Sequence, residues 1–141
     1  MRIRNRLLVM TWILCFIVSS ALADPFALAL GDSGYVLSIP GTWSTVTPDS
    51  GYAAAVKSPG GEKLNVKTTS KTLEEIWNAA ESPEDGTFGG VYWIIYQDGK
   101  RYAACTQLTD SCTAIVSFSR SNPLNSADNS AILSSLSKAL E

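Results

Sequence analysis

Short, mostly apolar stretches recur in the first half of the chain and are predicted to be β-strands. They lie at 35–39, 52–57 and 64–68, and the third alternates apolar and polar residues, a pattern typical of a half-buried strand. The second and third are separated by the turn sequence Pro59–Gly61. Because proline and glycine favour tight turns, we expect these two strands to form a hairpin.

The residues that follow change to the period of a helix. Thr72 and Glu75 form a capping box, in which each side chain binds an otherwise unpaired backbone N–H. Apolar side chains then recur on one face at spacings of three and four residues: Leu73, Ile76, Trp77 and Ala80. The pattern predicts a helix over 72–80, followed by a loop over 82–90.

The second half of the chain carries a stronger sheet pattern. Three apolar or aromatic stretches are predicted to be strands: Val91–Gln97, Arg101–Gln107 and Cys112–Arg120. Asp98 and Gly99 are the two-residue turn that hairpins favour. This turn places Tyr92 opposite Cys105 and Ile95 opposite Tyr102.

The end of the chain has a second helical pattern. We expect this helix to start at Ser126 or Asp128, and to bury Ile132, Leu133, Leu136 and Leu140. The element order is then β-β-β-α-β-β-β-α. This order predicts an α+β domain, with an antiparallel sheet of about six strands flanked by helices. Both faces of the later strands are apolar, so we expect cover on each side.

The first 23 residues have the three parts of a cleavable secretory signal. Three arginines precede an apolar run at 7–18, and a small-x-small ending leads to cleavage between Ala23 and Asp24. A membrane anchor is the alternative, but twelve residues span about 18 Å of helix against a hydrocarbon core of about 30 Å. We therefore expect residues 1–23 to be removed and residues 24–141 to form a single periplasmic or secreted domain, with no stable membrane insertion.

Removing the signal makes the protein more acidic. The chain has 11 basic and 13 acidic residues, and the signal takes three arginines with it. The mature part then has 8 basic and 13 acidic residues, a net charge of −5. Because such a protein repels phosphate backbones, nucleic acid is a poor partner, and we expect another protein instead.

Two cysteines remain in the mature part, Cys105 and Cys112. An isolated even pair in an oxidising compartment predicts a disulfide. A redox-active pair is the alternative, although its usual spacing is shorter. Directly opposed strand residues can be close enough for the bond, and a register that pairs the two cysteines agrees with the predicted hairpin. In that register Val116 and Phe118 share a face with both cysteines.

The segment Tyr35–Pro40, an aromatic-apolar strand that runs into Pro40-Gly41-Thr42-Trp43, resembles the opening of the PsbP/DcrB-like group. The element order and the closing helix agree with that group. The resemblance covers about residues 33–140 and implies an antiparallel sheet sandwiched by helices. It also implies an accessory, assembly or partner-binding role. It carries no catalytic residues over to this chain.

Few residues in the chain offer chemistry. Histidine is absent, which excludes the commonest general base and the usual serine and cysteine triads. We expect no catalytic, cofactor or metal site. Glu81, Glu84 and Asp85 could offer oxygen ligands to calcium, but they lack the spacing of a dedicated loop. The exposed contacts we expect are Trp43 and Phe88, with Glu84 and Asp85 as acidic neighbours.

These observations favour an exported, non-enzymatic binding or accessory protein that acts by protein–protein recognition. A second hypothesis is a periplasmic inhibitor or immunity protein against an exported toxin or hydrolase, because an acidic surface suits a cationic target. A third is a small carboxylate- or metal-dependent enzyme.

Overall fold

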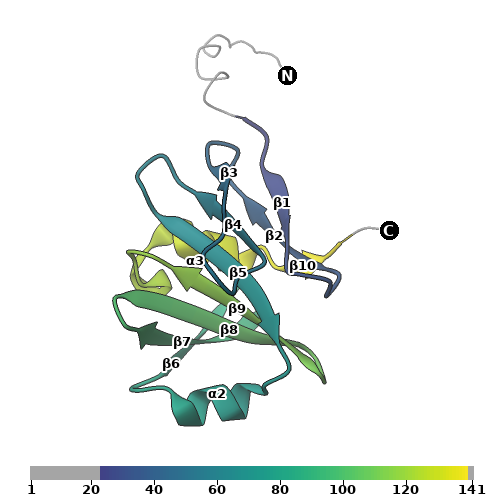
Figure 1. Cartoon of the computed structure of the whole chain (residues 1–141), viewed down its shortest axis with the longest axis vertical. Helices are drawn as coiled ribbons and strands as arrows, with labels where there is room; N and C mark the ends of the chain where they lie inside the picture. The colour runs from purple at the N-terminus through teal and green to yellow at the C-terminus, as the bar shows by residue number, and fades with distance from the viewer. Residues whose placement is uncertain (1–22, 140–141) are drawn as a thin grey trace, which may run out of the picture.

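The computed structural model describes residues 23–139, which form two antiparallel sheets and two short α-helices (Figure 1). The large sheet has the strand order β3-β4-β5-β9-β8-β7-β6. Its strands are β3 (Ser44–Val46), β4 (Ala54–Lys57), β5 (Lys63–Thr69), β6 (Glu84–Phe88), β7 (Val91–Asp98), β8 (Arg101–Thr109) and β9 (Cys112–Phe118). The small sheet has the order β1-β2-β10, with β1 (Phe26–Ala29), β2 (Tyr35–Ile39) and β10 (Ser137–Lys138). The helical elements are α2 (Leu73–Ala79), the 3-10 turn η2 (Pro123–Asn125) and α3 (Ala127–Ser134).

The predicted α+β class is confirmed, whereas the prediction of one sheet of about six strands is wrong. Strands β1, β3, β6 and β10 were not expected, and the segment 82–90, predicted to be a loop, contains β6 at the edge of the large sheet. The predicted hairpin of the second and third strands is present as β4 and β5. The signal sequence lies outside the described residues except for Ala23.

The inner face of the large sheet carries the main core. The small sheet and α3 pack against it, through Leu37, Ile39, Ile132 and Leu133 among others. The buried side chains of the large sheet that meet them include Val56, Leu64, Val66, Trp93, Ile95, Val116 and Phe118.

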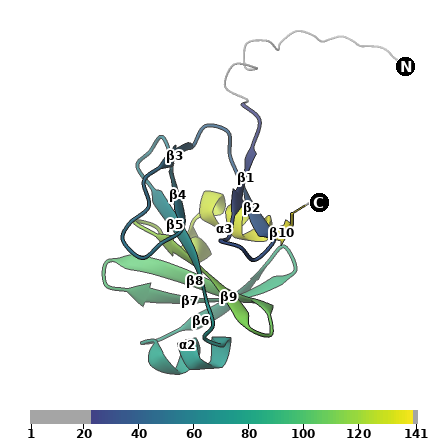
Figure 2. The ribbon, with the colours of Figure 1, turned by 45° about the vertical axis from the view of Figure 1, so that its right-hand side comes forward.

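The outer face is covered by α2, which lies at the opposite end of the molecule from the small sheet (Figures 1 and 2). The predicted capping box of this helix is present, because the Thr72 side chain accepts from Glu75 N–H and the Glu75 carboxylate accepts from Thr72 N–H. Ile76 packs on Ile94 and Cys105, and these three are the buried residues of the outer cluster.

The predicted turn of the β7–β8 hairpin is wrong by one position. Asp98 pairs with Arg101, so the two turn residues are Gly99 and Lys100. Gly99 has a φ of +65°, which is the left-handed conformation that this turn requires. As a result Cys105 lies opposite Ile94 instead of Tyr92. The shift is two residues along the partner strand, so every side chain keeps its predicted face.

The predicted register between β8 and β9 has a larger error. Cys105 pairs with Ile115, and a bulge lies between Gln107 and Thr109. The difference is an odd number of positions, which moves each side chain of β9 to the opposite face. Val116 and Phe118 therefore lie in the main core and not beside Cys105.

This register also overturns the predicted disulfide. Cys105 and Cys112 are free thiols in the structure. Cys112 pairs with Thr109, three residues along β9 from the partner of Cys105. At about 3.3 Å per residue this separates them by about 10 Å along the strand, beyond the reach of a disulfide.

The second helix is shorter than predicted. Its N-cap is Ser126, which accepts from Asn129 N–H, and Ile132 and Leu133 are buried as expected. The helix ends at Ser134, so the half-buried Leu136 lies beyond it. Leu140 lies outside the described residues. Strand β10 follows instead and pairs with β2.

Candidate functional site

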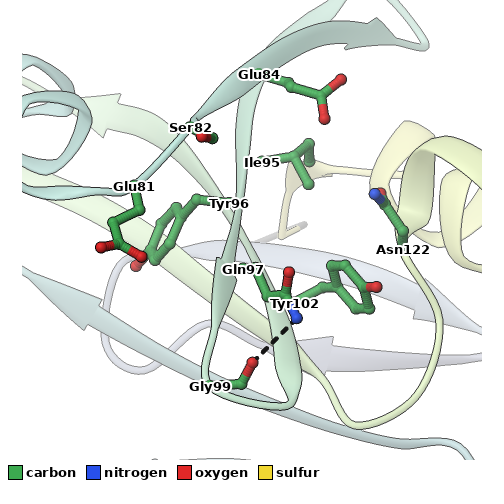
Figure 3. A pocket seen from close by; sticks show the side chains of 9 residues that line it. All are labelled: Glu81, Ser82, Glu84, Ile95, Tyr96, Gln97, Gly99, Tyr102 and Asn122. Atoms are coloured by element: carbon green, nitrogen blue, oxygen red, sulfur yellow. Dashed lines mark hydrogen bonds between the residues drawn. The ribbon is translucent and has the colours of Figure 1, made fainter.

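A hollow on the described part of the chain lies beside the turn end of the β7–β8 hairpin (Figure 3). Its volume is about 560 Å³. The residues that line it are Glu81, Ser82, Glu84, Ile95, Tyr96, Gln97, Gly99, Tyr102 and Asn122. We refer to it as the hairpin pocket.

The pocket exists because β6 is shorter than β7. The last pair between them is Glu84 with Ile95, whereas β7 continues to Asp98. Ser82 turns the chain away from the sheet just before β6. Its φ of 49° makes it the one non-glycine residue with positive φ among residues 23–139, a conformation that is uncommon outside glycine.

The lining residues divide between the two sides of β7. Ile95 and Tyr102 pack with the main core on the inner side, and Tyr96 packs with the outer cluster. Figure 3 shows Glu81 beside Tyr96 on one side of the strand, and Glu84, Tyr102 and Asn122 on the other. Each side therefore holds one tyrosine and one glutamate.

The electrostatics of the pocket are acidic. Both glutamates are exposed, and in the described region neither has an ion-pair or hydrogen-bond partner. Burial, followed by the nearby Cys105 thiol, raises the pKa of the Tyr96 hydroxyl, so this group stays neutral. Tyrosine rings and carboxylates without a countercharge both attract cations. The pocket is thus suited to a basic group.

The pocket lacks the geometry of a carboxylate pair that performs hydrolysis. Figure 3 shows the side chains of Glu81 and Glu84 pointing to different sides of the strand. Among residues 23–139, no group of three or more cysteines, aspartates or glutamates could hold a metal ion.

A second, smaller hollow of about 220 Å³ lies where the β4–β5 turn meets α3. Glu62, which is 9% exposed, is one of the residues that line it. Its carboxylate accepts hydrogen bonds from Arg120 N–H at 2.7 Å, Ser121 N–H at 3.1 Å, Ser119 Oγ at 3.1 Å and Asn129 Nδ2 at 3.3 Å. Because four donors already satisfy it, Glu62 has a structural role.

Sequence reasoning missed Glu62, because it follows the Pro59–Gly61 turn and no role was assigned to it. The signal that could have found it is an acidic residue directly after two glycines, at the start of an apolar strand. Ser58 supports the turn, because its Oγ accepts from Glu62 N–H at 2.9 Å.

The predicted contact residues do not form one surface. Trp43 is 7% exposed and belongs to the main core, so its predicted exposure is wrong. Phe88 is half-buried and packs on the same core. Glu84 lines the hairpin pocket, whereas Asp85 is exposed and accepts a hydrogen bond from Tyr92 Oη at 3.1 Å. Tyr92, which is 47% exposed, was not predicted as a contact.

The predicted cleavage residues, Ala23 and Asp24, are exposed and lie against Gly41. A Cβ at position 41 would collide with their backbone. The glycine of the Pro40–Trp43 motif therefore permits a close approach of two segments, and the tryptophan of that motif fills the core.

The described residues contain no helix long and apolar enough to cross a bilayer. No protein-family model matches the sequence, and no curated protein matches it either.

Two solved structures share the fold. One is a crystal structure from Bacteroides thetaiotaomicron VPI-5482, with a TM-score of 0.60 and 11% identity over 85% of this chain and 50% of that chain. Our chain thus corresponds to about half of that protein. The other is the solution structure of cyanobacterial PsbP (CyanoP) from Synechocystis sp. PCC 6803, with a TM-score of 0.51 and 14% identity over 82% of this chain and 93% of that chain. The fold is therefore PsbP-like, as the resemblance predicted.

Proposed function

We propose that this chain is an exported, non-enzymatic binding protein that recognises another protein through the hairpin pocket. The observation that carries the proposal is the pocket itself, a hollow of about 560 Å³ with two exposed carboxylates that lack a countercharge among the described residues. A partner with a basic segment would supply that charge.

Export is supported by the N-terminal sequence. The signal pattern ends at Ala23, and strand β1 starts shortly afterwards at Phe26. Removal of the signal leaves a net charge of −5, and such a charge speeds the encounter with a cationic partner.

A binding role is supported over catalysis by the groups that are present. The sequence has no histidine. Burial raises the pKa of the Cys105 thiol to about 12, so little of the reactive thiolate exists at neutral pH. The two glutamates of the pocket point apart and do not converge on one reacting atom.

The acidic pocket also favours a second candidate, an inhibitor or immunity protein that covers the active site of a cationic toxin or hydrolase. A cationic toxin encoded beside this gene would favour this role over the accessory one.

The proposal can be tested by capture from an extracellular or periplasmic extract of the source organism. The wild-type protein, the double variant Glu81→Gln/Glu84→Gln and the control Glu74→Gln are immobilised side by side. Glu74 is an exposed acid in the first turn of α2, outside the pocket. We expect one protein to be retained by the wild type and the control, and to be lost with the double variant or in 0.5 M salt. Salt should release it because the Debye screening length, about 8 Å at physiological ionic strength, becomes shorter as the salt concentration rises. Equal retention by all three proteins, or none by any, would contradict the proposal.

A further inference from the structure

The hairpin pocket contains a free strand edge as well as acidic side chains. Strand β7 is paired with β8 as far as Asp98, but its pairing with β6 stops at Ile95. Within the described region no strand pairs with Tyr96–Asp98 on the β6 side. The chain has turned away at Ser82, and the hollow lies where the missing pairs would be.

The backbone groups that face this edge belong to Gln97. In an antiparallel pair, residues alternate between hydrogen-bonded and non-hydrogen-bonded positions. The pair that closes the two-residue turn, Asp98 with Arg101, is hydrogen-bonded. Gln97, which lies opposite Tyr102, is then in a non-hydrogen-bonded position and directs its N–H and C=O away from β8. Tyr92 is at the other kind of position in this alternation, so its C=O should point toward β8. It does, because it accepts a hydrogen bond from Thr106 Oγ1 of β8 at 2.7 Å.

An extended chain laid along this edge would place successive side chains on opposite sides of the sheet. One side offers Glu81 and Tyr96, and the other offers Glu84 and Tyr102. The two sides are thus chemically alike. On each side a guanidinium or ammonium group could lie over the tyrosine ring and next to the glutamate carboxylate.

We propose that the hairpin pocket binds an extended segment of the partner protein, which pairs with Gln97 and places two consecutive basic side chains on opposite sides of β7. This inference rests on the proposed function and specifies the partner's chemistry. Backbone pairing supplies affinity, as in other cases where a peptide adds a strand to a sheet edge, and the two acidic sides supply specificity.

The direct test is isothermal titration of the exported, purified protein with the peptide acetyl-Thr-Val-Arg-Arg-Val-Thr-amide. The control peptide carries glutamine in place of both arginines. We expect saturable binding of the arginine peptide, weaker binding in high salt and no measurable binding of the control. A protein that binds both peptides equally, or neither, would overturn the inference.

Backbone pairing is tested by N-methylation of the peptide. Only the residue opposite Gln97 directs its N–H toward β7, and its neighbour directs its own N–H outward. We therefore expect N-methylation of one arginine to abolish binding and N-methylation of the other to leave it intact. If neither matters, a cation is bound without strand pairing, and the inference fails.

Protein variants complete the test. Glu81→Gln and Glu84→Gln should each weaken peptide binding about twofold to fivefold, as expected for exposed ion pairs, and Glu74→Gln should leave it unchanged. Gln97→Pro removes an N–H that β8 does not use, so it should abolish binding while thermal unfolding stays cooperative. If Gln97→Pro unfolds the protein, the two N-methylated peptides still decide the question on the wild type.

Two other outcomes separate this inference from the proposed function. If extract capture depends on Glu81 and Glu84 but the peptide does not bind, the function stands and the strand pairing falls. If sedimentation shows a dimer that the arginine peptide does not dissociate, the edge serves a second copy of the chain, and the inference is overturned.

Discussion

The inner face of the large sheet meets the small sheet and α3 over sixteen buried residues, whereas the outer face meets α2 over only three, Ile76, Ile94 and Cys105. Apolar burial is the main favourable term in folding. The inner face therefore supplies most of the stability, and the outer face adds a helix of seven residues that is too short to be stable alone. The hairpin pocket takes lining residues from both layers, Ile95 and Tyr102 from the inner one and Tyr96 from the outer one.

The largest expected effect comes from the inner face. Phe118 is fully buried in the main core. Phe118→Ala should lower the free energy of unfolding by about 3–5 kcal/mol, because it removes apolar contacts and leaves a cavity. Urea denaturation followed by tryptophan fluorescence measures the change. A loss below 1 kcal/mol would mean that the inner face is packed no better than the outer one.

Glu62→Gln should cause the next largest loss in the free energy of unfolding. The substitution removes the charge and turns an amide donor toward groups that already donate to the carboxylate. Unsatisfied buried donors cost about 1–3 kcal/mol, and we expect a loss in that range by the same urea assay. Glu84→Gln, at an exposed position, is the matched control and should leave the unfolding midpoint unchanged.

Ile76→Ala tests the outer face. It should destabilise by about 2 kcal/mol, near the lower limit for buried isoleucine, because Ile76 packs against only a small cluster. Amide hydrogen exchange should show faster opening over 73–79 and little change over 112–118. A uniform increase in exchange would show that the two layers unfold together, which would contradict the expectation that the outer layer is the less stable one.

Cys105 reports on the outer face, and Cys112 serves as the reference thiol. Cys112 is half-buried and Cys105 is buried under α2 with its pKa raised to about 12. At pH 8 we expect maleimide to label Cys112 at least tenfold faster than Cys105, and Ile76→Ala to accelerate Cys105 alone. Mass spectrometry counts the adducts. A protein that accepts no label until it is reduced would restore the disulfide hypothesis.

The smallest effect is expected at Asp49, outside both layers. A hydrogen bond from Lys63, opposed in part by desolvation and helped by Arg101, holds the pKa of this carboxyl below its usual 3.8. A lowered pKa stabilises the folded state above about 3.8, and this stabilisation is lost as the pH falls through the folded pKa. Asp49→Asn should therefore reduce the acid dependence of the urea midpoint between pH 5 and 2. Identical pH profiles would contradict the assignment.

The elements that could be predicted from the sequence are those with a strong local signal. The capping box at Thr72 and Glu75 identified α2, and the long apolar strands identified β7–β9. Strand β6, with the sequence EDGTF, lies at an edge with mostly exposed side chains and so lacks the expected alternation. Strand β10 has two residues and continues a helical pattern.

The register and the site depended on non-local detail. No residue pattern distinguishes the bulge between Gln107 and Thr109 from a regular ladder, and this bulge decides which face of β9 meets the core. The hairpin pocket arises from a difference in strand length and from one left-handed residue, Ser82. Glu81 and Glu84 were noted in the sequence as acidic residues, but their placement around β7 is a property of the folded sheet.

The small sheet joins segments from both ends of the chain. Lys138 pairs with Tyr35, and Ser135 Oγ accepts from Ser38 N–H at 2.8 Å across 97 positions. For a polypeptide that emerges N-terminus first, β2 has no partner on the β10 side until residues 137–138 have been delivered. Such distant pairing slows folding. Docking of β10 on β2 is therefore expected to be a late step of folding.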